Sequence, residues 1–379
     1  MNVKERIVAA LEVGKGRMPD KVPNHFVSLR TNFMKIVEKQ LEIKEENVVF
    51  DGGFDLTIAK AIGAESLKCG PGLVNYPPVK VPDWWFERNN IPLAERHLYG
   101  TGISGNITKR DPSREGEFDA WYVDGWITSE GDLTRMKGLM EQLRPPPRET
   151  LDRFNKFAAM AISKGICPIP AVGGPFTEVL EGMGWSAFAR AARKNIPFIR
   201  KFADIATDNA VLAISTICKE TDVKIVHLPD DIAMKQNVML TPALMKEVFF
   251  PCYQRITEAA HAHGGRIFLH TDGFVEPLIP AIVDAGFDGL QCLESAAGVD
   301  IRRVKKEWGR QICLIGNVDC NRDLFYMTPA QLERQAADMV NDLKDGGGYI
   351  FGPSSTIYGA HPLENLLAIV AGWLDARDY

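Results

Sequence analysis

The feature that most constrains the fold is a regular alternation of short apolar runs with amphipathic stretches after Leu151. Strand-like apolar runs begin near residues 166, 223, 266, 287, 312 and 348. Helical periodicity marks the stretches 242–263, 275–285, 329–344 and 363–375. Repeated strand–helix units predict an α/β fold, in which helices cover a parallel sheet. With further strands from the first third of the chain, the units predict a (β/α)8 TIM barrel. A doubly wound open sheet is the alternative.

Residues 1–150 have a different character. They are rich in glycine, proline and aromatic residues and end in the stiff Pro145-Pro146-Pro147 stretch. We expect 1–150 to form an irregular N-terminal extension over the barrel mouth, together with the first barrel elements. Residues 151–379 then form the main part of the barrel, within one structural domain. A G-x-G-x-x-G match at 100–105 does not lead into a convincing helix, so it does not indicate a dinucleotide site.

Composition excludes several classes of protein. The net charge of −5 is the opposite of the basic footprint of a nucleic-acid binder. No apolar run approaches the length of a membrane helix, and the charged start Met1–Arg6 leads into no apolar signal region. The seven cysteines are scattered, without a C-x-x-C pair, which argues against a zinc ribbon or a redox motif. A reducing, cytoplasmic location is the expectation.

Polar, often ionisable residues stand where the predicted strands end. They are Asp230 and Asp231, His270 and Asp272, Glu294, Asn317 and Asp319, and Ser354 and Ser355. Aspartate, asparagine and serine are common in turns and helix caps, so each of these residues alone has a structural explanation. Histidine and glutamate are poor turn residues. As a set they predict an active site at the carboxyl ends of the barrel strands.

His270-Thr271-Asp272-Gly273 is the sharpest local signal. Two residues apart on a strand end, His270 and Asp272 point to the same side and suit a shared metal, proton or substrate. The other histidines have simpler explanations. His227, inside an apolar run, is expected to be a satisfied core residue, and His261 and His263 lie at a helix end where positive charge is favourable.

From about Pro170 to Ala371 the chain resembles the uroporphyrinogen decarboxylase superfamily. The resemblance rests on segments near several strand ends and at the start of the last helix: Gly174-Pro175-Phe176, Pro229-Asp230-Asp231, His270-Thr271-Asp272-Gly273, Gly316-Asn317-Val318-Asp319, Gly347–Phe351 and Pro362-Leu363-Glu364-Asn365. The superfamily has a (β/α)8 barrel. It includes the decarboxylases of haem synthesis and many cobalamin-dependent methyltransferases.

Departures from the family patterns separate these branches. The branch that methylates coenzyme M has a His-x-Cys and a later cysteine as zinc ligands, and here those cysteine positions hold Asp272 and Ser355. The site would thus offer nitrogen and oxygen ligands in place of sulfur. Zinc also binds nitrogen and oxygen, but we do not expect this site to activate a thiol as the zinc site of that branch does. The decarboxylases grip porphyrin carboxylates with an arginine-rich N-terminal stretch. The comparable region here offers only Arg30, and the C-terminal histidine position is Ser355.

The resemblance therefore implies the O-demethylase type of corrinoid-dependent methyltransferase. Such an enzyme moves a methyl group from a methoxylated small molecule, with an aryl methyl ether preferred, to the Co(I) corrinoid of a partner protein. This chain lacks the Asp-x-His-x-x-Gly signature of a corrinoid carrier, so the cobalamin is expected on the partner. A homodimer is the expected self-association, although no motif encodes it.

We assign roles within this scheme as hypotheses. His270, Asp272 and Glu294 form the acid or metal site, with zinc as the expected metal, and Asp230 or Asp231 orients the donor. Substrate binding is assigned to Asn317, Ser355, Tyr358 and Trp121. Two alternatives stay open: a uroporphyrinogen-decarboxylase-like lyase acting on a small carboxylated substrate, and a non-catalytic barrel. The lyase needs a basic pocket, and the only visible cluster, at 302–306, has the spacing of a solvated helix face.

Overall fold

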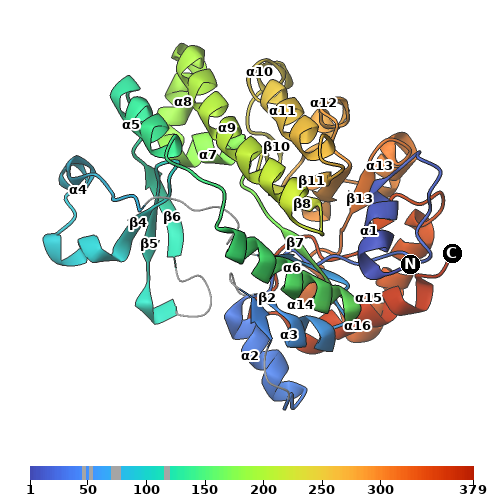
Figure 1. Cartoon of the computed structure of the whole chain (residues 1–379). Coiled ribbons are helices and arrows are strands. Elements are labelled where there is room, and N and C mark those ends of the chain that lie inside the picture. Colours follow the sequence, from blue (N-terminus) through green and yellow to red (C-terminus); the bar gives the residue numbers. More distant parts are fainter. Residues whose placement is uncertain (45–47, 51–53, 70–77, 115–119) are drawn as a thin grey trace.

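A set of parallel strands forms the centre of the molecule (Figure 1). The computed structural model describes residues 1–44, 48–50, 54–69, 78–114 and 120–379. Five strands form one continuous sheet in the order β14–β13–β12–β11–β8. Their bounds are β8 Ile225–Pro229, β11 Arg266–Thr271, β12 Gly289–Cys292, β13 Cys313–Ile315 and β14 Tyr349–Ile350. All five lie within or beside apolar runs of the sequence, because strands buried on both faces are apolar throughout.

Parallel bridges close this sheet into a barrel. Strand β3 (Ser66–Cys69) pairs with β7 (Cys167–Pro170), and the bridge Ala171↔His227 joins β7 to β8. The segment around residues 24–26 completes the ring, since Asn24 pairs with Phe351 after β14 and Phe26 pairs with Leu67 of β3. Counting that segment, eight parallel strands form the closed (β/α)8 barrel that the sequence predicts.

Helices surround the barrel and follow its strands along the chain (Figure 1). Those outside the extension are α1 Val3–Leu11, α2 Thr31–Gln40, α3 Leu56–Ala61, α6 Arg148–Ser163, α7 Pro175–Met183, α8 Trp185–Lys194, α9 Ile196–Glu220, α10 Pro242–Val248, α11 Phe250–His261, α12 Ile279–Asp284, α13 Ile301–Trp308, α14 Asp323–Tyr326, α15 Pro329–Leu343 and α16 Leu363–Ala376. The predicted helix over 242–263 is two helices. Pro251 cannot donate an amide hydrogen bond, so it stands in the first turn of α11 rather than inside a continuous helix.

The pair α15 and α16 shows how sequence builds the outer layer. Thr328 caps α15 in a reciprocal capping box with Gln331. The buried face of α15 carries apolar residues at helical spacing, from Leu332 to Leu343. Gly372 of α16 lies against this helix, and a Cβ there would come 2.0 Å from the carbonyl oxygen of Glu333. Only glycine allows the two backbones to approach so closely.

The N-terminal extension is more regular than its composition predicts. Strands β4 (Tyr99–Thr101), β5 (Asn106–Arg110) and β6 (Ala120–Gly125) form an antiparallel sheet beside the barrel, at the left of Figure 1. Helices α4 (Asp83–Arg88) and α5 (Glu130–Met140) flank it, while β1 (Val49–Phe50) pairs with β2 (Phe54–Asp55) elsewhere. The glycine-rich 100–105 segment is the β4–β5 hairpin, with Gly105 at a φ of 88°.

The extension is anchored to the barrel through α7. A Cβ on Gly125 at the end of β6 would lie 2.3 Å from the carbonyl oxygens of Glu181 and Gly182, so the sheet packs directly on that helix. The amide of Ile127 donates to the Gly182 carbonyl at 2.9 Å. Because α7 begins at the carboxyl end of β7, this contact places the extension at the rim of the barrel mouth.

Two further observations concern the class of protein. None of the described helices is both long and apolar enough to cross a membrane. All seven cysteines are buried free thiols, so no disulfide contributes to the stability of this barrel.

Candidate functional site

His270, near the end of β11, is held in a defined orientation. Its Nδ1 is hydrogen-bonded to Oε1 of Gln291 on the neighbouring strand β12. The amide of Gln291 is oriented in turn, because its Nε2 donates to the Ser354 carbonyl at 3.3 Å. Oε1 therefore accepts from His270, Nδ1 carries the proton, and Nε2 is the ring atom left for chemistry.

The free Nε2 faces two carboxylates. Ligand atoms of Asp231, His270 and Asp272 all lie within 4.8 Å of one another, and Nε2 is 3.7 Å from Oδ1 of Asp272. The Asp272 amide also donates to Asp231 Oδ1 at 3.1 Å, which fixes the two acidic residues together. Three electron-rich atoms at this separation repel one another unless a proton or a metal cation lies between them. The donor set of one imidazole and two carboxylates fits zinc.

Two side chains from the end of β12 complete this side of the mouth. The Cys292 thiol donates to Asp272 Oδ1 at 3.0 Å, and Glu294 Oε2 accepts from the Gly273 amide at 2.8 Å. Burial and Asp272 raise the pKa of Cys292 well above its usual range, so this group is a thiol donor. Burial also raises the pKa of Glu294. We call Asp231, His270, Asp272 and Glu294 the acidic wall.

The backbone beneath the acidic wall is strained. Cys292 and Leu293 have φ angles of 92° and 52°, a left-handed conformation that costs energy for residues with side chains. Asn317, predicted to bind substrate, is buried and donates from Nδ2 to the Leu293 carbonyl at 2.6 Å. Its hydrogen bond stabilises the turn that presents Cys292 and Glu294 to the mouth.

Asp230 and Asp231 are neighbours with different surroundings. Asp230 is 1 % exposed and accepts hydrogen bonds from the amides of Phe176 and Thr177 and from the hydroxyl of Tyr253. Burial raises its pKa to about 6. These contacts fasten the first turn of α7 to the end of β8, whereas Asp231 is exposed toward the mouth.

Further carboxylates line the rim on α7. Burial and the nearby Glu178, Asp231 and Asp230 raise the pKa of Glu181 to about 7. Glu178 and Glu181 interact with Ser104 and Asn106 of the β4–β5 hairpin. The extension thus contacts the barrel close to the acidic wall.

The remaining predicted substrate residues lie in different places. Ser355 follows β14, and its amide contacts the Cys320 sulfur at 3.3 Å. The Tyr358 ring packs edge-on against His361, with ring centroids 4.3 Å apart. Trp121 lies on β6 of the extension, opposite Lys109, and is 38 % exposed.

Cysteines lie beside both positions where the coenzyme M branch has cysteine ligands. Cys292 contacts Asp272, and Cys320 contacts Ser355. Burial raises the pKa of Cys320 to about 11, so it too is a thiol in this structure. Sequence reasoning missed them because it looked for C-x-x-C spacing. Their position at or just after a strand end was the available signal.

The opposite side of the barrel interior contains groups that the sequence interpretation did not assign. The Ser66 hydroxyl donates to the Asn24 carbonyl at 2.8 Å, so His25 donates from Nδ1 to Ser66 Oγ at 3.0 Å. Its ring lies 5.7 Å from that of His227, which lies 5.5 Å from that of His270. His227 is buried as predicted. Among the described residues, neither of its ring nitrogens has a hydrogen-bond partner.

Lys68 lies nearer the barrel mouth than the neighbouring His25. On β3, Lys68 is two residues beyond Ser66, so both side chains face the barrel interior and Lys68 is nearer the mouth. Burial and Arg30 lower its pKa. We call Lys68, Arg30 and His25 the basic wall, because they come from the first strand segment and β3, across the interior from the acidic wall.

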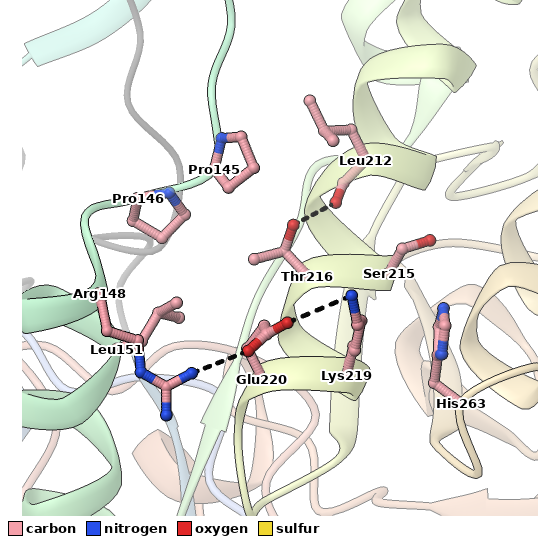
Figure 2. Close-up of a pocket in the computed structure, with 10 residues that line it drawn as sticks. All are labelled: Pro145, Pro146, Arg148, Leu151, Leu212, Ser215, Thr216, Lys219, Glu220 and His263. Carbon is pink, nitrogen blue, oxygen red and sulfur yellow. Dashed lines mark hydrogen bonds and ion pairs between the residues drawn. The ribbon is translucent and has the colours of Figure 1, made fainter.

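A surface groove of about 490 Å³ lies elsewhere, between the start of α6 and the second half of α9 (Figure 2). Its polar residues pair among themselves: Arg148 contacts Glu220 at 3.0 Å, and Thr216 donates to the Leu212 carbonyl at 2.8 Å. Since α9 leads into the start of β8, the groove lies toward the end of the barrel opposite the mouth. It brings together none of the predicted site residues.

The fold and the mouth define a (β/α)8-barrel protein with a histidine–carboxylate site at the carboxyl ends of its strands. The uroporphyrinogen decarboxylase (URO-D) family model matches residues 140–372. The chain therefore belongs to the uroporphyrinogen decarboxylase family.

One solved structure supports the fold, and a second is a more distant match. A methyltransferase from Methanosarcina mazei is 18% identical and has a TM-score of 0.64, with 99% of each chain covered. D-psicose 3-epimerase from Clostridium cellulolyticum H10, with D-tagatose, is 9% identical with a TM-score of 0.41, covering 94% of this chain and 97% of that one. No curated protein matches the chain.

Proposed function

We infer that the protein is a methyltransferase, which moves a methyl group from a methoxylated small molecule to the Co(I) corrinoid of a partner protein. The single observation that carries this proposal is the oriented Nε2 of His270 facing Asp231 and Asp272. The URO-D family membership and the fold shared with a protein named as a methyltransferase support it. An aryl methyl ether is the preferred donor.

The main catalytic requirement on this chain is to stabilise a poor leaving group. When bound, the Co(I) corrinoid supplies the nucleophile that takes the methyl group. The methyl C–O bond breaks, and its electron pair stays on the ether oxygen. A phenolate forming there needs a proton or a cation. His270 Nε2 lies where it can deliver a proton, and the carboxylates of Asp231 and Asp272 stabilise the imidazolium before transfer.

The same residues would hold a zinc ion. Asp231, His270 and Asp272 would supply one imidazole nitrogen and two carboxylate oxygens as its ligands. A bound zinc ion would supply Lewis acidity in place of the proton. In either case Gln291 keeps Nε2, rather than Nδ1, directed toward Asp231 and Asp272.

A lyase acting on a small carboxylated substrate is the second candidate function, and one observation favours it. Lys68 is a half-buried cation at the mouth, with Arg30 nearby. The sequence showed no basic pocket for such a substrate, because Arg30 and Lys68 lie far apart along the chain. The corrinoid reaction is preferred since the acidic wall offers leaving-group chemistry that decarboxylation does not need.

The test combines a spectroscopic assay with elemental analysis. Purified protein is mixed with chemically reduced cobalamin and a panel of methoxylated phenols and methoxylated aromatic acids, and methylcobalamin is followed by absorbance. Zinc per chain is measured on the same sample. Methylcobalamin formation with any donor supports the proposal, and the zinc content tells metal from proton assistance. The assay is repeated with the cognate corrinoid carrier, because free cobalamin can be a poor substitute.

Failure with the carrier across the panel would contradict the methyltransferase proposal. The same acids, without the methoxy group, are then tested for release of CO2. Release that depends on Lys68 would favour the lyase.

A further inference from the structure

The starting observation is a cation on the interior face of β3. Ser66 and Lys68 share that face, and Ser66 Oγ bonds to His25 Nδ1 at 3.0 Å inside the barrel. The parallel register opposite Cys167 and Ile169 fixes the strand in this orientation. Lys68 therefore projects toward the mouth from one level above the His25 ring.

Nothing within the described ranges neutralises this ammonium. Among residues 1–44, 48–50, 54–69, 78–114 and 120–379, no acidic side chain forms an ion pair with Lys68. Arg30, at the end of the first strand segment, adds a second positive charge, and burial together with Arg30 lowers the pKa of Lys68. A half-buried ammonium without a counter-charge is unfavourable unless a ligand supplies an anion.

The histidines below Lys68 provide the second observation. His25 Nε2 and both ring nitrogens of His227 lack hydrogen-bond partners among the described residues, and the two side chains are 1 % and 0 % exposed. Buried polar atoms left unpaired destabilise the folded protein. Burial and the nearby His270 and Lys68 lower the pKa of His25 to about 3, so this ring is neutral. Its one proton is on Nδ1, so His25 Nε2 accepts a hydrogen bond from water, whereas a neutral His227 keeps one N–H that can donate to an anion's oxygen or to water beside it.

The two walls make the mouth electrically asymmetric. The row His25–His227–His270, with ring centroids 5.7 and 5.5 Å apart, leads from the basic wall to the acidic wall. A donor that carries an anion at one end and a methoxy group at the other would match both walls. A neutral methoxyphenol would leave Lys68 without a counter-charge.

We propose that Lys68 binds a carboxylate of the methyl donor, so that the substrate class is a methoxylated aromatic carboxylate oriented with its ether oxygen at His270. The identity of the donor rests on the proposed methyl transfer. The anion subsite itself stands on Lys68 and the unpartnered ring nitrogens of His227, whatever reaction follows. Lys68 is a specificity-determining residue under this proposal, since it contacts the substrate away from the reacting atoms.

The experiment measures binding without any corrinoid, so that it is independent of turnover. The probes are 3- and 4-methoxybenzoate and the corresponding neutral methoxybenzyl alcohols, titrated calorimetrically into the full-length protein. The variants are Lys68→Met, which removes the charge, and Lys68→Arg, which keeps it. Lys164→Met is the matched control, because Lys164 is exposed and precedes β7 at the end of the barrel opposite the mouth.

We expect the wild type to bind at least one methoxybenzoate roughly tenfold or more tightly than its alcohol, as a charge-assisted hydrogen bond would give. Lys68→Met should abolish that preference and leave the affinity for the alcohol unchanged, which also reports an intact pocket. Lys68→Arg should keep part of the preference, and Lys164→Met should keep all of it.

Two results would overturn the proposal: a wild type without preference for the acid, or a preference that survives in Lys68→Met. Methyl transfer is assayed separately on the same proteins. Lys68-dependent carboxylate binding without methyl transfer would leave the subsite standing and reject the proposed reaction. Methyl transfer from neutral donors at a rate that does not depend on Lys68 would support the proposed reaction and reject the carboxylate subsite.

Discussion

The two walls of the barrel mouth differ in how well their polar atoms are partnered. On the acidic wall, a backbone amide bonds to Asp231 and another to Glu294, Gln291 holds His270, and the Cys292 thiol bonds to Asp272. On the basic wall, His25 has one ring nitrogen without a hydrogen-bond partner among the described residues, and across the interior His227 has two. A fully supported set of groups is typical of chemistry that needs fixed geometry. A set of buried polar atoms without hydrogen-bond partners is typical of a surface to which a ligand binds.

The largest expected effect comes from removing one carboxylate of the acidic wall. Asp272→Ala deletes a group 3.7 Å from His270 Nε2, and we expect a loss of about 10²–10⁴-fold in kcat/KM for methyl transfer, together with loss of bound zinc if zinc is present. Glu294→Gln is the comparison variant and should lose less, because the Glu294 carboxylate is occupied by the Gly273 amide. Equal losses in both variants would contradict this division of roles.

A smaller effect is expected from Gln291→Leu, which removes the support of His270 without touching the substrate. Freed at Nδ1, the ring can change tautomer, and supporting hydrogen bonds of this kind contribute about 10–100-fold. The measurements are kcat, KM and zinc affinity. We expect kcat or zinc affinity to fall while KM for the donor stays close to the wild type. A uniform rise in KM with normal kcat would show that Gln291 acts on substrate binding instead.

The free energy of unfolding should be sensitive to changes around Asp230, which holds the α7–β8 junction, and insensitive to changes at Asp231. In Gly174→Ala the new Cβ would lie 2.2 Å from Oδ2 of Asp230, and overpacking of this kind costs about 1–3 kcal/mol in the free energy of unfolding. Asp231→Asn, in contrast, should leave stability within about 0.5 kcal/mol, since that side chain is exposed. Denaturant unfolding measures both. A stable Gly174→Ala protein would mean that the junction can shift and that Asp230 is not fixed.

The last expected effect is a pH dependence of stability carried by His25. Burial lowers its folded-state pKa to about 3 from an ordinary value of 6.5, so the unfolded chain binds more protons between these values. The stabilisation is therefore complete above pH 6.5 and is lost as pH falls toward 3, by about 1.4 kcal/mol per pH unit. His25→Leu should flatten the slope of unfolding free energy between pH 6 and about 4.5. An unchanged slope would contradict the neutral buried ring. The exposed His97→Leu is the control.

Much of the barrel could be predicted, because buried parallel strands are apolar runs and the intervening helices are periodic. Thr328 and Pro329 marked the start of α15 correctly. The first strand, around Asn24–Phe26, could not be recognised, since its pairing consists of single bridges with β14 and β3 that are remote in sequence. The sheet of the extension was missed because its strands are short and mostly half-exposed.

The site was predictable in part for the same reason. His270 and Asp272 were found because they lie two apart on one strand end. Lys68 and Cys292 were not, since a lysine or cysteine inside an apolar run looks like an ordinary surface or core residue until the barrel closes around it. Charge asymmetry across the mouth arises from residues about two hundred positions apart, which no local pattern contains.

The most direct test of the account is methyl transfer to reduced corrinoid by three proteins measured side by side: wild type, His270→Ala and His263→Ala. His263 is the matched control, because it follows α11 on the side where β11 begins, away from the mouth. The account predicts roughly a 10³-fold or greater loss for His270→Ala with unchanged circular dichroism, and activity close to wild type for His263→Ala. A wild-type rate in the folded His270→Ala protein would contradict it.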